Sequence, residues 1–153
     1  MTKEIGTKAL KPNPALKPFE PLIGEWQTVG SHPYFPDITL HGHVLFEWIE
    51  GGAFLKMSSQ VDHPQFPDGV AIFGSDDNLK TYYQIYFDER GVSRKYDVST
   101  TGETITWRRD DPHFSQRFTL TIEEDKMIGT GEMSRDSGDW ESDLSLTYTR
   151  RAS

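Results

Sequence analysis

The sequence predicts an all-β fold: a single antiparallel up-and-down barrel of about ten strands with a short N-terminal helix. Turn signals rich in Gly, Pro, Asn and Asp separate short alternating segments every ten or so residues, and no long stretch has helical periodicity. The folded part also opens with Gly24-Glu25-Trp26 and ends with Arg150. Packing of that guanidinium on the indole would seal one end of a closed barrel.

The segment before the first strand predicts a short helix. Residues 1–12 are polar and are expected to form a flexible tail, which leaves 13–151 as the barrel domain. Asn13 is a good N-cap and Pro14 suits the first helical position. Pro18 and Pro21 limit the length of the helix, so we expect it to plug one mouth of the barrel.

Ten strands then follow in order along the chain. They are expected at 22–31, 39–50, 53–61, 70–75, 81–87, 92–99, 103–109, 115–123, 126–134 and 139–150. A proline-broken loop at 32–37 separates the first strand from the second, and another at 62–69 separates the third from the fourth. Shorter Gly or acidic turns separate the other strands. Turn signals at this spacing indicate a meander in which each strand pairs with its sequence neighbour.

The alternation of apolar and polar residues predicts which side chains face inward. In the last strand the inward set is Trp140, Leu144, Leu146, Tyr148 and Arg150, and the outward set is Glu141, Asp143, Ser145, Thr147 and Thr149. The second and fifth strands are apolar or aromatic on both faces, so alternation does not assign their facing.

Composition narrows the class of partner. The 24 acidic and 16 basic side chains give a formal charge of −8, which argues against a nucleic-acid partner. The absence of cysteine excludes disulfides and thiolate-bound metals, and the polar N-terminus carries neither a signal peptide nor a membrane span. We therefore expect a cytoplasmic protein without a cofactor. The sequence also contains no phosphate loop or nucleophile elbow.

The best candidates for a ligand site are polar side chains that alternation turns inward. Arg94 shares a face with Tyr96, and Gln116 shares one with Phe118. An inward guanidinium needs an acid, a ligand carboxylate or water as its partner; the alternatives are an arginine at the surface or one paired within the protein. The expected binding residues are Arg94, Gln116, Tyr96, Trp107, Phe118 and Tyr86.

A weaker candidate is the pattern His41-x-His43-x-x-x-Glu47, whose side chains share one face of a strand and could bind a divalent metal. Phe46 and Trp48 are the better core residues on this strand, so His43 and Glu47 are expected to face solvent. The pattern therefore favours a solvated strand face, and no metal site is predicted.

The chain resembles the calycin superfamily of lipocalins, fatty-acid-binding proteins and nitrobindin-like barrels, and most of all a bacterial calycin-like family of unknown function. The resemblance rests on Gly24-Glu25-Trp26 with the closing Arg150, and on the segments 46–55, 86–96 and 114–118. It implies a small-molecule pocket inside the barrel. Nitrobindin-like proteins bind haem through a histidine late in the chain, whereas the last histidine here is His113, so that mode of haem binding is not expected.

Three hypotheses for function follow. The first is a carrier or sensor of a small hydrophobic or amphiphilic molecule held inside the barrel. The second is an enzyme of isomerase, cyclase or decarboxylase type that acts on an enclosed small molecule. The third is a filled barrel with a structural or interaction role, able to form a homodimer through its outer aromatic strands.

Overall fold

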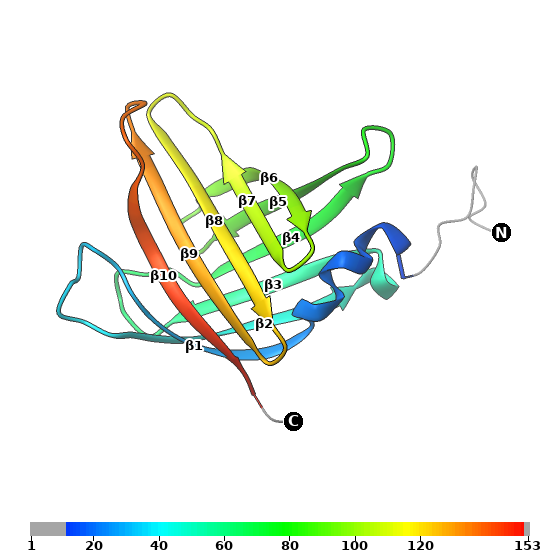
Figure 1. The fold of residues 1–153 in the computed structure, drawn as a ribbon, viewed down its shortest axis with the longest axis horizontal. Coiled ribbons are helices and arrows are strands. Elements are labelled where there is room, and N and C mark those ends of the chain that lie inside the picture. The colour runs from blue at the N-terminus through cyan, green and yellow to red at the C-terminus, as the bar shows by residue number, and fades with distance from the viewer. Residues whose placement is uncertain (1–11, 152–153) are drawn as a thin grey trace.

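The computed structural model describes residues 12–151, which form one closed ten-stranded antiparallel barrel with a short helix at one end (Figure 1). The flexible tail expected at 1–12 falls almost wholly on residues 1–11, outside the described residues. The 3₁₀ helix η1 spans Pro14–Leu22 and a second short one, η2, spans Glu50–Gly52. The strands are β1 Gly24–Ser31, β2 Leu40–Ile49, β3 Phe54–Val61, β4 Gly69–Asp76, β5 Thr81–Asp88, β6 Ser93–Thr101, β7 Thr104–Arg109, β8 Phe114–Glu123, β9 Lys126–Arg135 and β10 Glu141–Arg150.

Each strand pairs with its neighbours in sequence, and β1 pairs with β10 to close the barrel. The predicted meander is therefore confirmed. The connections at the end covered by η1 are tight turns, whereas the Pro-containing loops 32–39 and 62–68 lie at the opposite end (Figure 1). We call these the plugged end and the open end.

The helix η1 plugs its end of the barrel with apolar side chains. Asn13 caps it, since its side-chain oxygen accepts the Ala15 N–H at 3.0 Å. Leu16, Phe19 and Leu22 are fully buried. The Phe19 ring lies 5.7 Å from the Phe73 ring of β4. This half of the barrel is therefore packed solid, and its fully buried side chains include Trp26, Phe46, Leu55, Phe73, Ile105, Leu120 and Met127.

Arg150 and Trp26 hold the plugged end together. The Arg150 guanidinium carbon lies 4.2 Å from the centre of the Trp26 ring, which is fully buried. Arg150 also donates to the carbonyl of Pro21 at 2.9 Å, and Trp26 Nε1 donates to the carbonyl of Leu22 at 2.8 Å. The last strand, the first strand and the C-terminal end of η1 are thus fixed to one another.

The glycine two residues before Trp26 makes room for this contact. Gly24 has φ of +129°, and a Cβ atom there would lie 2.6 Å from Nη1 of Arg150. Only glycine combines that backbone conformation with the close approach of the guanidinium.

The predicted facing of the last strand is wrong at its start. The register with β9 shifts between Ser142 and Ser145, which is a β-bulge. Trp140 consequently lies on the outer face, where its ring centre is 3.9 Å from the Arg117 guanidinium. Asp143, expected outside, lines the interior instead. An extra residue in one strand breaks the period of two on which the prediction rested.

Among residues 12–151, neither short helix has the length and apolar character that a membrane-spanning helix requires.

The packing of Arg150 on Trp26 predicts that two Trp→Ala variants differ strongly in stability. Trp26→Ala should lower the free energy of unfolding by about 3–5 kcal/mol, because it deletes a fully buried ring and the platform under Arg150. Trp140→Ala is the matched control and should cost clearly less, since that indole lies on the outer face. Urea denaturation of both variants measures the difference; equal losses would contradict the seal.

Candidate functional site

The open half of the barrel contains a cavity of about 300 Å³. Its apolar wall includes Val44, Met57, Leu146, Trp107 and Phe118. The last two rings are stacked, with centres 5.1 Å apart and an interplanar angle of 26°. This volume is at the lower end of the range found for ligand pockets, which is about 300–1,000 Å³.

A chain of hydrogen bonds crosses the mouth of the cavity. The Tyr96 hydroxyl donates to Oε1 of Gln116 at 3.1 Å, and Nε2 of Gln116 donates to Asp143 at 3.1 Å. The second Asp143 oxygen lies 2.8 Å from Nε2 of His32. Nδ1 of His32 accepts the backbone N–H of Tyr34 at 3.0 Å, so the ring proton is on Nε2 and is donated to Asp143.

This chain of hydrogen bonds fixes the side chains at the mouth of the cavity. Both ring nitrogens of His32 and both carboxylate oxygens of Asp143 are engaged within the protein. Burial raises the pKa of Tyr96, which keeps its phenol protonated as the donor at the end of the chain. These hydrogen bonds connect β6, β8 and β10 to the start of the 32–39 loop, directly after β1.

Aromatic side chains from the two long loops gather beside the same entrance. The Phe66 ring lies 5.8 Å from the His32 ring and 5.7 Å from the Phe35 ring. His63 packs 5.0 Å from Phe35 and completes the cluster. The loops 32–39 and 62–68 are therefore joined by aromatic contacts at the open end.

A second polar group is built around Asp88, whose partners Tyr86 and Arg90 line the cavity. The Tyr86 hydroxyl donates to Asp88 at 2.7 Å, and Arg90 donates to both oxygens, at 2.8 and 3.2 Å. The bonds from Arg90, and then that from Tyr86, hold the pKa of Asp88 well below its usual range. Burial, reinforced by Asp88, raises the pKa of Tyr86. The positive charge of Arg90 is thus already matched by an acid.

One polar group of the cavity wall has no protein partner. Gln84 lies on β5 between Phe73 of β4 and Tyr96 of β6, and its side chain is only 1% exposed. Within residues 12–151, Nε2 of Gln84 has no hydrogen-bond acceptor. Such a group costs about 1–3 kcal/mol when it stays unpaired.

The structure brings together five of the six residues expected at a ligand site. Those that line the cavity are Gln116, Tyr96, Trp107, Phe118 and Tyr86. Arg94 lies nearby at the start of β6, where it is half-buried and donates to the carbonyl of Ser93 at 2.9 Å. The cavity lining includes Arg90 and Arg117, but Arg117 of β8 turns its guanidinium outward onto Trp140.

Sequence analysis did not single out Asp143, His32 or Gln84. The bulge that turns Asp143 inward leaves no signal in the alternation pattern. His32 begins a loop, and its partner is 111 residues away in the chain. Gln84 is the one amide among the aromatic residues of β5, and that contrast was the available signal.

The weak metal candidates lie on the outside of the barrel. His41 and His43 are exposed and Glu47 is half-buried. Over residues 12–151, His, Cys, Asp and Glu side chains form no group of three or more that could hold a metal ion. The side chain of His113 is 88% exposed and lies 3.6 Å from Asp136.

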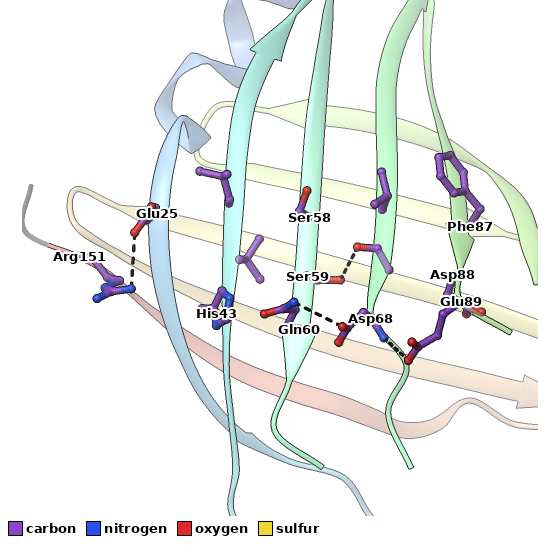
Figure 2. Close-up of a pocket in the computed structure, with 14 residues that line it drawn as sticks. Glu25, His43, Ser58, Ser59, Gln60, Asp68, Phe87, Asp88, Glu89 and Arg151 are labelled. Carbon is purple, nitrogen blue, oxygen red and sulfur yellow. Dashed lines mark hydrogen bonds and ion pairs between the residues drawn. The ribbon is translucent and has the colours of Figure 1, made fainter. Parts of the chain in front are cut away.

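A broader groove of about 580 Å³ lies on the outer face of β1–β5 (Figure 2). Most polar side chains of this groove form hydrogen bonds or ion pairs with one another. Glu25 pairs with Arg151 at 3.5 Å, Gln60 donates to Asp68 at 3.4 Å, and the Asp68 N–H donates to Glu89 at 3.1 Å. The interior cavity is the better candidate site, because its wall contains two stacked aromatic rings and a buried amide nitrogen with no partner within residues 12–151.

The outer surface of β5 has apolar side chains. Ile85 and Phe87 are 41% and 44% exposed. The homodimer expected through outer aromatic strands stays a prediction, as does the cytoplasmic location.

Solved structures of other proteins share the fold of this chain. No family model matches the chain, and no curated protein matches it. The structure of Rv2717c from M. tuberculosis superposes with a TM-score of 0.66 at 16% identity, covering 91% of this chain and 98% of that one. The S-type phycobiliprotein lyase CPES of Guillardia theta gives 0.57 at 13% identity, covering 88% and 91%.

A third solved structure is the zebrafish ileal bile acid-binding protein in complex with cholic acid. It gives a TM-score of 0.53 at 16% identity, and the match covers 86% of this chain and 99% of that one. At these identities the likeness shows the fold alone. The chain therefore has the calycin-like barrel fold that its sequence resembles.

The Asp88 group predicts how stability depends on acid pH. Because its folded pKa lies below the unfolded value, its contribution is present above about pH 4 and is lost as the pH falls toward the folded pKa. Asp88→Asn should lower the unfolding free energy at pH 7 and weaken its decline between pH 5 and 3. Asp97→Asn, on the exposed face of β6, is the control. An unchanged pH dependence in urea titrations of Asp88→Asn would contradict the prediction.

Proposed function

We propose that this protein binds a small hydrophobic or amphiphilic molecule in the cavity of its open half. The observation that carries the proposal is an apolar cavity of about 300 Å³ with a buried, unpartnered amide in its wall. A barrel evolved only for stability would fill this space, because a cavity lowers stability and an unpaired buried amide lowers it further.

The division of the barrel supports the same proposal. The plugged half is packed solid by η1 and by large apolar side chains, so the open half is free of that structural task. The aromatic loops 32–39 and 62–68 stand at the entrance, where a ligand would pass. The zebrafish neighbour is described in complex with cholic acid, so a barrel of this shape accommodates such a molecule.

The six residues expected from the sequence receive roles within this proposal. Trp107 and Phe118 form a flat wall for the apolar body of the ligand, and Tyr86 extends it. Gln116 and Tyr96 offer polar contacts from the mouth. Arg94, opposite the cavity residue Tyr86 in the β5–β6 pair, would meet an acidic or polar group that projects out of the cavity.

A neutral fluorescent probe tests the proposal. 1-Aminoanthracene should bind wild-type protein with 1:1 stoichiometry and gain fluorescence as it enters the cavity. Leu146→Trp should weaken this binding by about tenfold or more, because the indole would occupy the cavity that Leu146 lines. Thr149→Trp, exposed on the same strand, is the matched control and should bind normally.

Two further measurements make the outcome decisive. Thermal denaturation with and without the probe should show stabilisation of wild type, whether or not Leu146→Trp folds. Native mass spectrometry of freshly purified protein should show a co-purified small molecule. Absence of probe binding to the wild type, or equal binding by both tryptophan variants, would overturn the proposal.

A further inference from the structure

We propose that Gln84 is the polar anchor of the cavity, and that the buried end of its ligand is an uncharged, flat, apolar group with one carbonyl-type acceptor. This inference rests on the proposed function and specifies the chemical class of its ligand. Four features of the cavity support it.

The first is the state of the Gln84 amide itself. Nε2 is a donor with no acceptor within residues 12–151, although the side chain is only 1% exposed. Buried polar groups are almost always paired, so an unpaired one calls for a specific explanation. A ligand oxygen in the cavity would supply the missing acceptor.

The second is that the cross-strand neighbours of Gln84 offer it no hydrogen-bond acceptor. Tyr96, which faces Gln84 across the β5–β6 pair, donates its hydroxyl proton to Gln116. Phe73, its neighbour on β4, has no acceptor oxygen in its side chain. Gln84 therefore lies between the packed half and the open half and is one of the residues that line the cavity.

The third is charge. Arg90 is bonded to Asp88, and Arg117 donates to both oxygens of Glu132 at 2.8 and 3.1 Å. The guanidinium of Arg117 also lies on the outer face, against Trp140. Arg90 is thus the arginine whose charge could reach the cavity, and it is matched by an acid, whereas Asp143 brings a carboxylate to the same wall. A carboxylate buried here would meet an acid and no uncommitted arginine of the cavity wall, so an uncharged acceptor is favoured.

The fourth is shape. The stacked rings of Trp107 and Phe118 present a planar wall, and Val44, Met57 and Leu146 also line the space. An engineered cavity of about 150 Å³ holds benzene, and this one has about twice that volume. A fused two-ring system with a short carbonyl substituent is a ligand of matching size.

Three naphthalenes that differ only in their substituent test this inference. 2-Acetylnaphthalene carries the acceptor, 2-ethylnaphthalene lacks it and 2-naphthoate is charged. In displacement of 1-aminoanthracene from wild type, the ketone should bind about tenfold more tightly than each of the other two, the size expected for one buried hydrogen bond.

The variant Gln84→Leu removes the donor and keeps a similar volume. It should bind the ketone and 2-ethylnaphthalene equally, and it should raise the melting temperature of the empty protein, because an unpaired buried amide is replaced by an apolar group. Gln27→Leu, on the exposed face of β1, is the control and should retain the preference for the ketone.

A spectroscopic readout keeps the test valid if Gln84→Leu does not fold. In wild type, the side-chain NH₂ resonances of Gln84 should shift when the ketone is added and stay unshifted with 2-ethylnaphthalene. If 1-aminoanthracene binds but the ketone has no advantage, an ordered water satisfies the amide and this inference alone is wrong. If 1-aminoanthracene does not bind, the proposed function itself fails.

Discussion

The contact between Arg150 and Trp26 is the interaction on which the interior of this barrel depends. It joins the last strand to the first, and its hydrogen bond to Pro21 attaches η1 to both. With that end closed and packed, the plugged half contributes fully buried apolar side chains that stabilise the fold. The other half can then keep a cavity without loss of the structure.

In the open half, the largely buried acidic side chains have hydrogen-bond partners within the protein. A bulge turns Asp143 toward the interior, where both of its carboxylate oxygens accept hydrogen bonds, one from Gln116 and one from His32. Asp88 is satisfied in the same way by Arg90 and Tyr86. The amide of Gln84 differs from these groups, because its Nε2 is the fully buried side-chain donor that lacks a partner within residues 12–151.

The sequence predicted the fold well because the fold depends on local signals. Alternation and turn residues locate ten strands to within a few residues, and the residues at the two ends of the folded part, Trp26 and Arg150, indicate closure. The site depends on signals that are not local. A bulge reverses the facing of Asp143, and His32 meets it across 111 residues. Gln84 lies on a strand with aromatic residues on both faces, where alternation assigns no interior.

The most direct test of this account is a high-resolution crystal structure of freshly purified protein. The account predicts electron density for a non-protein molecule between Trp107 and Leu146, with an oxygen within hydrogen-bond distance of Nε2 of Gln84. A barrel whose side chains fill this space, with the Gln84 amide bonded to a protein group, would contradict it.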